Sequence, residues 1–206
     1  MLLEIHPDTP DTRKVKIVCE CLDDGGTIIY PTDTVYGMGC DVSNAKAFQK
    51  VAQLKNIKPD KAQFSIICYD LSHLSSYTRH VDNVTFKVMK RALPGPFTFI
   101  LQAGSNLPKH FKNKKKTIGI RIPDHLIPRT IVQELGRPIV TTSVHDDDEI
   151  IDYTTDPYEI HQKFKDKVDI VIDAGFGQNR ASTVVDCSNG TYEVVRQGIG
   201  RLEDIL

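Results

Sequence analysis

Seven hydroxyl and basic residues stand where predicted strands end, and their side chains suit the binding of phosphate and carboxylate groups. Arginine and lysine form their strongest hydrogen bonds with anionic acceptors, and neighbouring hydroxyl groups can complete such a site. Taken alone, each residue also fits a surface or strand-ladder position. Together, at the ends of five different strands, they predict one pocket for a polyanionic ligand: Thr34, Lys58, Thr117, Arg121, Ser143, Ser182 and Arg196.

The usual motifs of several other ligand and catalytic sites are missing from the sequence. There is no G-x-x-x-x-G-K-[ST] loop, and neither Gly37-Met38-Gly39 nor Gly175-Phe176-Gly177 extends to G-x-G-x-x-G. No serine lies in a G-x-S-x-G elbow. Cys19 and Cys21 have no second Cys/His pair at zinc-finger spacing. Catalytic residues and a resident metal site are therefore not assigned.

A polar string, residues 31–39, follows directly on an apolar run and is the most informative stretch of the chain. The run Thr27-Ile28-Ile29-Tyr30 is rich in β-branched residues and predicts a short buried strand. Thr32, Thr34 and Tyr36 then place hydroxyl groups at the strand end, and the two glycines beyond them allow another backbone to come close. Open α/β sheets bind ligands at such strand ends. The alternative is a polar strand end followed by a glycine turn.

The elements that must position these residues alternate between strands and helices along most of the chain. Apolar residues at helical spacing, with capping residues before them, predict helices over residues 13–24, 44–54, 82–93, 123–136 and 156–167. Short apolar runs predict strands at residues 1–6, 27–30, 64–69, 97–101, 117–122, 138–144 and 168–172. Ser188-Asn189-Gly190 predicts a hairpin between residues 182–187 and 191–196. The pattern indicates an α/β fold on a mixed sheet, with residues 1–206 as a single domain without linker or repeat.

Composition excludes some classes of partner. The chain has 40% apolar and 26% charged residues and a net charge of −1, so no global field attracts nucleic acid or membrane. Its five cysteines are scattered and odd in number, which is typical of buried thiols in a reducing compartment. No apolar run approaches the roughly 20 residues needed to cross a bilayer, and no signal peptide precedes the first helix. We expect a cytoplasmic protein with no membrane partner.

Two charged runs have alternative interpretations. The basic run at residues 109–116 could contact the RNA backbone through its lysines, with His110 and Phe111 available for base stacking. The lysines that would contact RNA are Lys112, Lys114, Lys115 and Lys116. The alternative interpretation of this run is an exposed mobile loop. The acidic run at residues 146–149 could bind a metal ion. A solvated acidic loop is the favoured interpretation, because four adjacent carboxylates rarely converge without intervening turn residues.

The polar string at residues 31–39 closely resembles the signature of the YrdC/YciO family, and further segments match the family in order and spacing. These segments cover nearly the whole chain: Pro94-Gly95-Pro96-Phe97-Thr98, Thr117-Ile118-Gly119-Ile120-Arg121-Ile122-Pro123, Thr141-Thr142-Ser143, Ser182-Thr183-Val184-Val185-Asp186 and Arg196-Gln197-Gly198. The resemblance implies a twisted mixed parallel/antiparallel sheet flanked by helices, with an open, positively charged cavity.

For function, the resemblance implies a threonylcarbamoyl-AMP synthase-like nucleotidyltransferase. Such enzymes join L-threonine, bicarbonate and ATP, release pyrophosphate, and supply the threonylcarbamoyl group for modification of adenosine in tRNA. Carried over by position, Thr34, Thr117 and Arg121 would bind threonine, with Arg121 gripping its carboxylate through two nitrogens. Residues at the ATP side would be Lys58, Ser143, Ser182 and Arg196. Mg²⁺ is expected on the phosphates. Partners implied are AMP, tRNA or double-stranded RNA, and other tRNA-modification proteins.

Three departures from the synthase pattern place the chain nearer the YciO branch. The family's K-x-R-P string becomes Lys55-Asn56-Ile57-Lys58-Pro59. A gapless match puts Asn56 at the lysine and Lys58 at the arginine, whereas an inserted Ile57 would keep Lys55 at the lysine. S-x-N becomes Ser143-Val144-His145, and Ile67 stands where a histidine is usual. The alternative function is therefore a paralogue that binds nucleotide and RNA, or acts on threonylcarbamoyl adducts, without making the adenylate.

Overall fold

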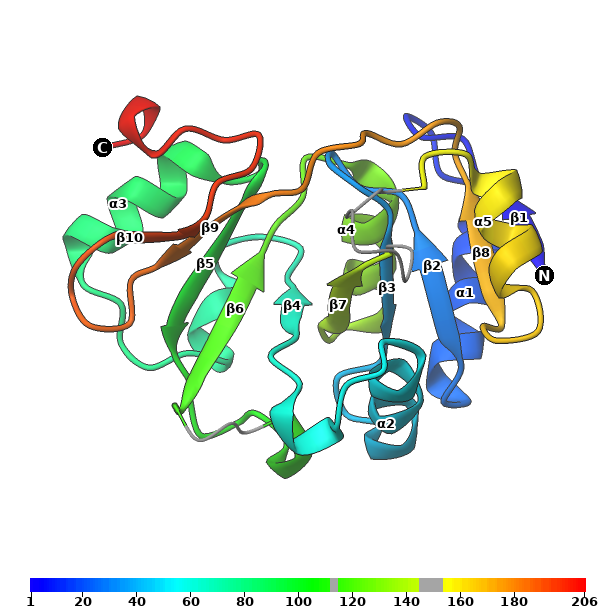
Figure 1. Cartoon of the computed structure of the whole chain (residues 1–206), viewed down its shortest axis with the longest axis horizontal. Helices are drawn as coiled ribbons and strands as arrows, with labels where there is room; N and C mark the ends of the chain where they lie inside the picture. Colours follow the sequence, from blue (N-terminus) through cyan, green and yellow to red (C-terminus); the bar gives the residue numbers. More distant parts are fainter. Residues whose placement is uncertain (112–114, 145–153) are drawn as a thin grey trace.

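The computed structural model describes residues 1–111, 115–144 and 154–206, which form a ten-stranded sheet with helices packed against it (Figure 1). The strand order is β1-β8-β2-β3-β7-β4-β6-β5-β9-β10. The strands are β1 (Leu2–Glu4), β2 (Thr27–Tyr30), β3 (Gly37–Cys40), β4 (Ser65–Ile67), β5 (Phe97–Gln102), β6 (Thr117–Arg121), β7 (Ile139–Ser143), β8 (Ile170–Asp173), β9 (Thr183–Asp186) and β10 (Glu193–Arg196). Five α-helices occur in the described part: α1 (Thr12–Asp23), α2 (Ala45–Leu54), α3 (Asn83–Ala92), α4 (Leu126–Leu135) and α5 (Pro157–Phe164).

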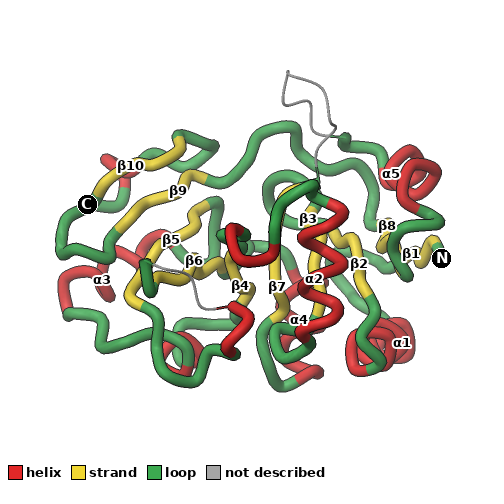
Figure 2. Tube along the Cα trace, turned by 60° about the horizontal axis from the view of Figure 1, so that its bottom comes forward, coloured by secondary structure: helices red, strands yellow, loops and turns green. Residues whose placement is uncertain are grey.

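The sheet mixes parallel and antiparallel pairs, which confirms the predicted fold class. Parallel pairs join β1 with β8, β2 with β8, β4 with β6, and β5 with β9. The other neighbours, including β3 with β7 and β9 with β10, are antiparallel. The sheet is strongly twisted, and β1 and β10 lie at its two ends together with the chain termini (Figures 1 and 2).

Alternating residues of the central strands pack into two separate apolar cores on opposite faces of the sheet. Ile28 and Tyr30 belong to the core under α1 and α4, whereas Ile29 belongs to the larger core that includes α2 and α5. The same alternation occurs in β8, where Ile170 and Val171 belong to different cores. Successive side chains of a strand point to opposite faces of the sheet, so helices on both faces bury all of them. All four residues of β2 are therefore buried.

The two glycines of the polar string lie inside a strand rather than in a turn. Gly37–Cys40 forms β3, which pairs with β2 on one side and β7 on the other. A Cβ added at Gly39 would lie 1.8 Å from the carbonyl oxygen of Val140 on β7. A Cβ at Gly37 would lie 2.9 Å from the Tyr30 ring. The predicted close backbone approach is therefore present, but it serves strand pairing, so the glycine-turn alternative was wrong.

Helix starts follow the capping residues, with one difference from the sequence prediction. Asp11, Asn44 and Asp156 accept hydrogen bonds from backbone N–H groups at the starts of α1, α2 and α5. α4 begins at Leu126, later than the predicted start at residue 123. His125 is its N-cap, and the Nδ1 atom of His125 accepts a hydrogen bond from the backbone N–H of Ile127 at 3.3 Å. Histidine is an unusual cap, which is why the sequence pattern pointed to the preceding Pro-Asp pair.

The His125 cap should make stability depend on pH. Burial lowers the pKa of His125 below the ordinary value of 6.5. The negative charges of Asp33, Asp8 and Asp124 raise this pKa, but burial has the larger effect. Below the ordinary value the unfolded chain takes up a proton that the folded ring resists, so stability falls as pH falls. His125→Asn keeps a capping oxygen and cannot titrate. We expect the melting temperature to drop less between pH 7.5 and 5.5 in His125→Asn than in the wild type, as measured by circular dichroism.

Equal drops in the two proteins would contradict this assignment. His73 and His161, whose pKa values are also lowered by burial, are present in both proteins and therefore do not affect the comparison.

Candidate functional site

A cavity of about 250 Å³ opens over the central strands and contains most of the predicted ligand-binding residues. Strand alternation explains its lining on β6, where Thr117, Gly119 and Arg121 face the cavity while Ile118 and Ile120 are buried in the core. The other lining residues come mainly from β4, β5, β7, β9 and β10 or the segments next to them: Val35, Gln63, Phe64, Ser65, Thr98, Ile100, Thr141, Thr142, Ser143, Ala181, Ser182, Val184, Val195 and Arg196.

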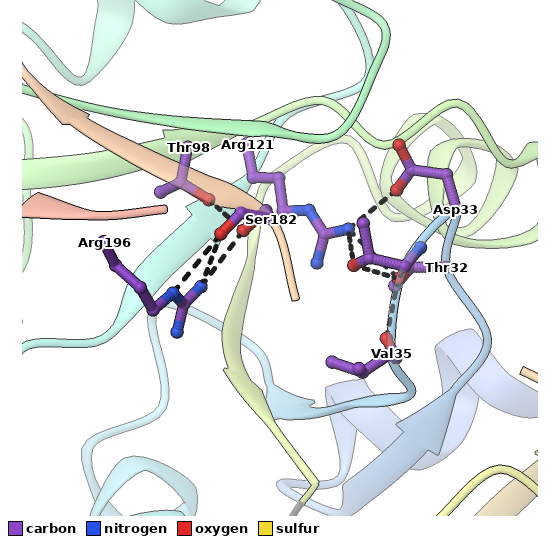
Figure 3. Close-up of polar contacts among 8 residues, drawn as sticks. Thr32, Asp33, Val35, Thr98, Arg121, Ser182 and Arg196 are labelled. Carbon is purple, nitrogen blue, oxygen red and sulfur yellow. Dashed lines mark hydrogen bonds and ion pairs between the residues drawn. The ribbon is translucent and has the colours of Figure 1, made fainter. Parts of the chain in front are cut away.

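Arg121 is held on one side of the cavity by the polar string at residues 31–39. Its Nη2 atom donates to Thr32 Oγ1 at 3.1 Å, to Asp33 Oδ1 at 2.7 Å and to Thr34 Oγ1 at 2.5 Å (Figure 3). Thr32 Oγ1 in turn donates to the carbonyl of Val35 at 2.7 Å. The side chain of Arg121 is 7% exposed and that of Asp33 is 10% exposed, so this is a largely buried ion pair. The string thus fixes the position of the guanidinium group.

Two polar atoms of this cluster are buried and have no hydrogen-bond partner among the described residues. They are the Nε atom of Arg121 and the Oδ2 atom of Asp33. Buried polar groups nearly always find a partner, so such atoms indicate a position that water or a ligand completes. Figure 3 shows that all contacts drawn to the guanidinium group of Arg121 end on one nitrogen, Nη2.

A second group of polar residues lines the same cavity next to Arg121, on β5, on β10 and at the residue before β9. Thr98 and Ser182 share a hydrogen bond between their hydroxyl oxygens at 2.9 Å. Arg196 Nη2 donates to the carbonyl of Ser182 at 2.9 Å and is 3.3 Å from Ser182 Oγ (Figure 3). Ser182 is buried, whereas Arg196 lies on an exposed strand. This second group therefore combines two hydroxyl donors with a cation that solvent can reach.

The lysine nearest the site is Lys55 rather than Lys58. Lys55, the C-cap of α2, donates through Nζ to the carbonyl of Ser143 at 2.9 Å, which brings its ammonium group to the end of β7. Lys58 is exposed at the start of a short 3-10 helix, and neither lysine is among the residues that line the cavity. Asn56 has a φ of 52°, a left-handed conformation that lets the chain turn sharply after α2. The arrangement matches the alternative with an inserted Ile57.

Lys55 and Lys58 should therefore differ in their effect on ligand binding. We expect Lys55→Met to weaken ATP binding about tenfold or more, because it removes a cation beside Ser143. Lys58→Met, which removes the same charge from an exposed site outside the cavity, should change the affinity less than twofold. Isothermal titration of both variants with ATP measures the difference. Equal losses of ATP affinity in the two variants would contradict the inference that proximity to Ser143 distinguishes Lys55 from Lys58.

The structure brings together five of the seven residues predicted from sequence: Thr117, Arg121, Ser143, Ser182 and Arg196 line the cavity. Thr34 is fully buried behind it and acts on the site through Arg121. Sequence reasoning missed Asp33 and Thr98 as members of the polar clusters. The signal was available, because both residues lie in the segments that carry the family resemblance.

Several predictions fall on residues that the structure does not describe or places differently. Lys112, Lys114 and His145, as well as the acidic run at residues 146–149, lie outside the described residues. Lys115 and Lys116 are exposed, as an RNA contact requires. Phe111, however, is 6% exposed and packs edge-on against Phe48 at 5.3 Å, so it is not available for base stacking. That part of the prediction was wrong, because the ring completes an aromatic cluster in the core.

His110 is also engaged in the fold. Its Nε2 atom is 3.0 Å from the carbonyl oxygen of Val42, and its ring packs against Phe48 at 5.3 Å. The ring therefore anchors its segment to the body of the protein.

Cysteine nucleophiles and a metal cluster find no support in the described residues. The five cysteines are free thiols, and four are buried. Burial raises the pKa of Cys68 and of Cys187 to about 12 and that of Cys19 to about 11, which keeps the thiols protonated. No group of three or more His, Cys, Asp or Glu side chains that could hold a metal ion occurs in the described ranges. Nor does a helix there have the length and apolar character to cross a membrane.

Fold and site together define an α/β protein with a cavity at its strand ends that is lined by hydroxyl groups and two arginines. The Sua5/YciO/YrdC family model, described as "Telomere recombination", matches residues 20–198. The uncharacterized protein YciO of Escherichia coli strain K12 is 36% identical over 204 residues, covering 98% of this chain and 97% of that protein. The chain belongs to the Sua5/YciO/YrdC family.

Solved structures and a further relative place the chain within that family. The crystal structure of E. coli YciO matches with a TM-score of 0.92 and 35% identity, covering 100% of this chain and 99% of that chain. P. abyssi Sua5 complexed with L-threonine has the same fold, with a TM-score of 0.90 at 23% identity, and this chain covers 59% of it. A threonylcarbamoyl-AMP synthase of Pseudoalteromonas translucida is 28% identical over 186 residues, covering 87% of this chain and 96% of that protein.

Proposed function

We propose that the protein condenses L-threonine, bicarbonate and ATP to L-threonylcarbamoyl-AMP and pyrophosphate, as a threonylcarbamoyl-AMP synthase-like nucleotidyltransferase. The observation that carries the proposal is the presence of two polar groups in one cavity. One group is Arg121 with its buried polar partners, and the other is Ser182 with Arg196. Two cationic groups facing one cavity suit two ligands with separate anionic groups. The 28% identity to a threonylcarbamoyl-AMP synthase supports the same reaction.

In this proposal Arg121 and Thr117 bind threonine, and Thr34 holds Arg121 in place. The threonine amine attacks bicarbonate-derived CO2 to form a carbamate. A carbamate oxygen then attacks the α-phosphorus of ATP, and the bond to pyrophosphate breaks. Such a reaction needs no covalent protein nucleophile, so the chain contributes by orienting two ligands and stabilising phosphate charge. The complex of P. abyssi Sua5 with L-threonine supports threonine as the amino acid.

Ser182 and Arg196 bind the phosphates in this proposal, with Ser143 and the neighbouring Lys55 at the opposite end of the cavity. Mg²⁺ would arrive with ATP, held by phosphate oxygens. The proposed setting is tRNA threonylcarbamoyladenosine synthesis in the cytoplasm, with tRNA-modification proteins as partners. RNA binding through Lys115 and Lys116 and the undescribed lysines before them belongs to the same proposal.

Pyrophosphate release is the direct test. We expect release that requires threonine, bicarbonate and ATP together, and a loss of at least about tenfold in Arg196→Gln, which removes the cation but keeps a polar side chain. Thermal stabilisation by ATP and threonine should exceed the sum of the two separate effects, because both ligands bind the folded state in one cavity. No pyrophosphate at high enzyme concentration would refute the synthase reaction.

A second candidate is a paralogue that binds nucleotide or acts on threonylcarbamoyl adducts without making the adenylate. It is favoured by the 36% identity to YciO over the whole chain and by a lysine at the position of the family arginine. Lys58→Arg combined with His145→Asn should then raise synthase turnover. No gain from the double change would argue against these two positions as the limiting ones.

A further inference from the structure

Asp33 is the charged partner of Arg121, and nothing in the proposed reaction assigns it a role. Its Oδ1 atom lies 2.7 Å from Arg121 Nη2, with both side chains at most 10% exposed. Each partner also retains one buried atom without a hydrogen bond, Oδ2 of Asp33 and Nε of Arg121. A buried, closely paired cation has much less net charge to offer a ligand than a free one. The pairing should therefore affect what the cavity binds.

The contact geometry limits how Arg121 can bind a carboxylate. A guanidinium group grips a carboxylate through two nitrogens along either of two edges, Nε with Nη2 or Nη1 with Nη2. Nη2 belongs to both edges and already donates to Thr32, Asp33 and Thr34. A two-nitrogen grip, expected from the sequence, would require Nη2 to exchange one of these partners. While Asp33 stays in place, the guanidinium nitrogens without a partner among the described residues are Nη1 and the buried Nε, and these two nitrogens share no edge.

The electrostatics then favour one class of ligand. A simple carboxylate entering the cavity would add a second negative charge beside Asp33, with Arg121 as the one cation of the cluster. A free amino acid brings an ammonium group with its carboxylate, so the ligand and the ion pair remain neutral together. The ammonium group need not touch Asp33, because charges several ångströms apart interact strongly where water is excluded.

We infer that Asp33 is a positioning residue that fixes Arg121 and makes this cavity select zwitterionic amino acids over simple carboxylates. The inference rests on the proposed binding of threonine at Arg121 and adds the basis of its selectivity. The matched probes are L-threonine and (R)-3-hydroxybutyrate, which has the same carbon skeleton, hydroxyl and carboxylate but no amine. Isothermal titration of the whole protein with each probe gives the selectivity ratio.

In the wild type we expect threonine to bind at least about tenfold more tightly than (R)-3-hydroxybutyrate. Asp33→Asn keeps an oxygen acceptor for Nη2 and removes the charge, so affinity for (R)-3-hydroxybutyrate should rise about fivefold or more and the ratio should fall. Asp33→Glu keeps the charge and should retain selectivity. Asp166→Asn is the matched control, because it removes the same charge at an exposed position that does not line the cavity, and it should leave the ratio within about twofold of wild type.

Equal affinity of the wild type for the two probes would overturn the inference, and this comparison needs no variant to fold. An unchanged or lower affinity of folded Asp33→Asn for (R)-3-hydroxybutyrate would also overturn it. Failure of the proposed function looks different. A wild type that selects threonine but releases no pyrophosphate would refute synthesis and leave the selectivity intact. If Asp33→Asn gains (R)-3-hydroxybutyrate binding but the protein binds no threonine, the assignment of threonine as the ligand is refuted. The exclusion of simple carboxylates by Asp33 then still holds.

Discussion

Arg121→Ala should abolish threonine binding and lower the free energy of unfolding by about 3–5 kcal/mol, the usual cost of removing one partner of a buried ion pair. The loss has two causes. Asp33 would remain buried without its counter-ion, and Thr34 would lose the bond that joins it to β6. Urea denaturation followed by circular dichroism measures the stability, and isothermal titration measures threonine binding.

The double variant Arg121→Ala with Asp33→Ala separates stability from binding. Removal of both charges leaves no buried ion, so we expect the double variant to recover much of the stability lost in Arg121→Ala. Threonine binding should stay absent, because the guanidinium group is still missing. A double variant that is less stable than Arg121→Ala would show that Asp33 stabilises the fold through contacts other than Arg121. An Arg121→Ala protein as stable as the wild type would show that the pair is not effectively buried.

Gly39→Ala should destabilise the protein by about 3 kcal/mol or more, at the upper end of the cost of overpacking. The added Cβ would lie 1.8 Å from the carbonyl oxygen of Val140, and a backbone atom held by pairing of β3 with β7 cannot move away cheaply. The two strands would have to separate near Ser143, so ATP binding should weaken as well. Urea denaturation and titration with ATP measure the two effects.

Gly136→Ala is the matched control for this change. Gly136 ends α4 with a φ of +71°, and a Cβ there would meet nothing within 4 Å. Its cost is therefore backbone strain alone, about 1–2 kcal/mol. If Gly39→Ala costs no more than Gly136→Ala, then the approach of β3 to β7 is looser than the structure shows.

Much of the fold was predictable because its local signals agree with its packing. The apolar run at residues 117–122 correctly predicted a strand, and Ser188-Asn189-Gly190 correctly predicted the hairpin of β9 and β10. The strand formed by Gly37–Cys40 was missed, because glycine has low strand propensity. Its strand conformation depends on β2 and β7, which lie on either side. A local pattern carries no information on such neighbours.

The candidate site was also predictable only in part. Residue types at strand ends were enough to predict the hydroxyl and basic residues, and most of them line the cavity. The pairing of Arg121 with Asp33 was not predictable, because it joins residues 88 positions apart and depends on the placement of β6 beside the polar string. The role of Lys55 was left open for a similar reason. The hydrogen bond from Lys55 Nζ to the carbonyl of Ser143, which the sequence does not reveal, shows which lysine lies at the end of β7.

The position of Arg196 on the last strand of the sheet has a consequence for the order in which the site can come apart. β10 has one neighbour, β9, all four of its residues are exposed, and its pairing register shifts between Val194 and Arg196. Edge segments with few buried contacts open locally at a lower free energy than the core. Arg121, on an interior strand, stays in place during such an opening. The proposed phosphate side can therefore fray and reclose while the threonine side remains intact, and bound ATP would slow hydrogen exchange in β10 first.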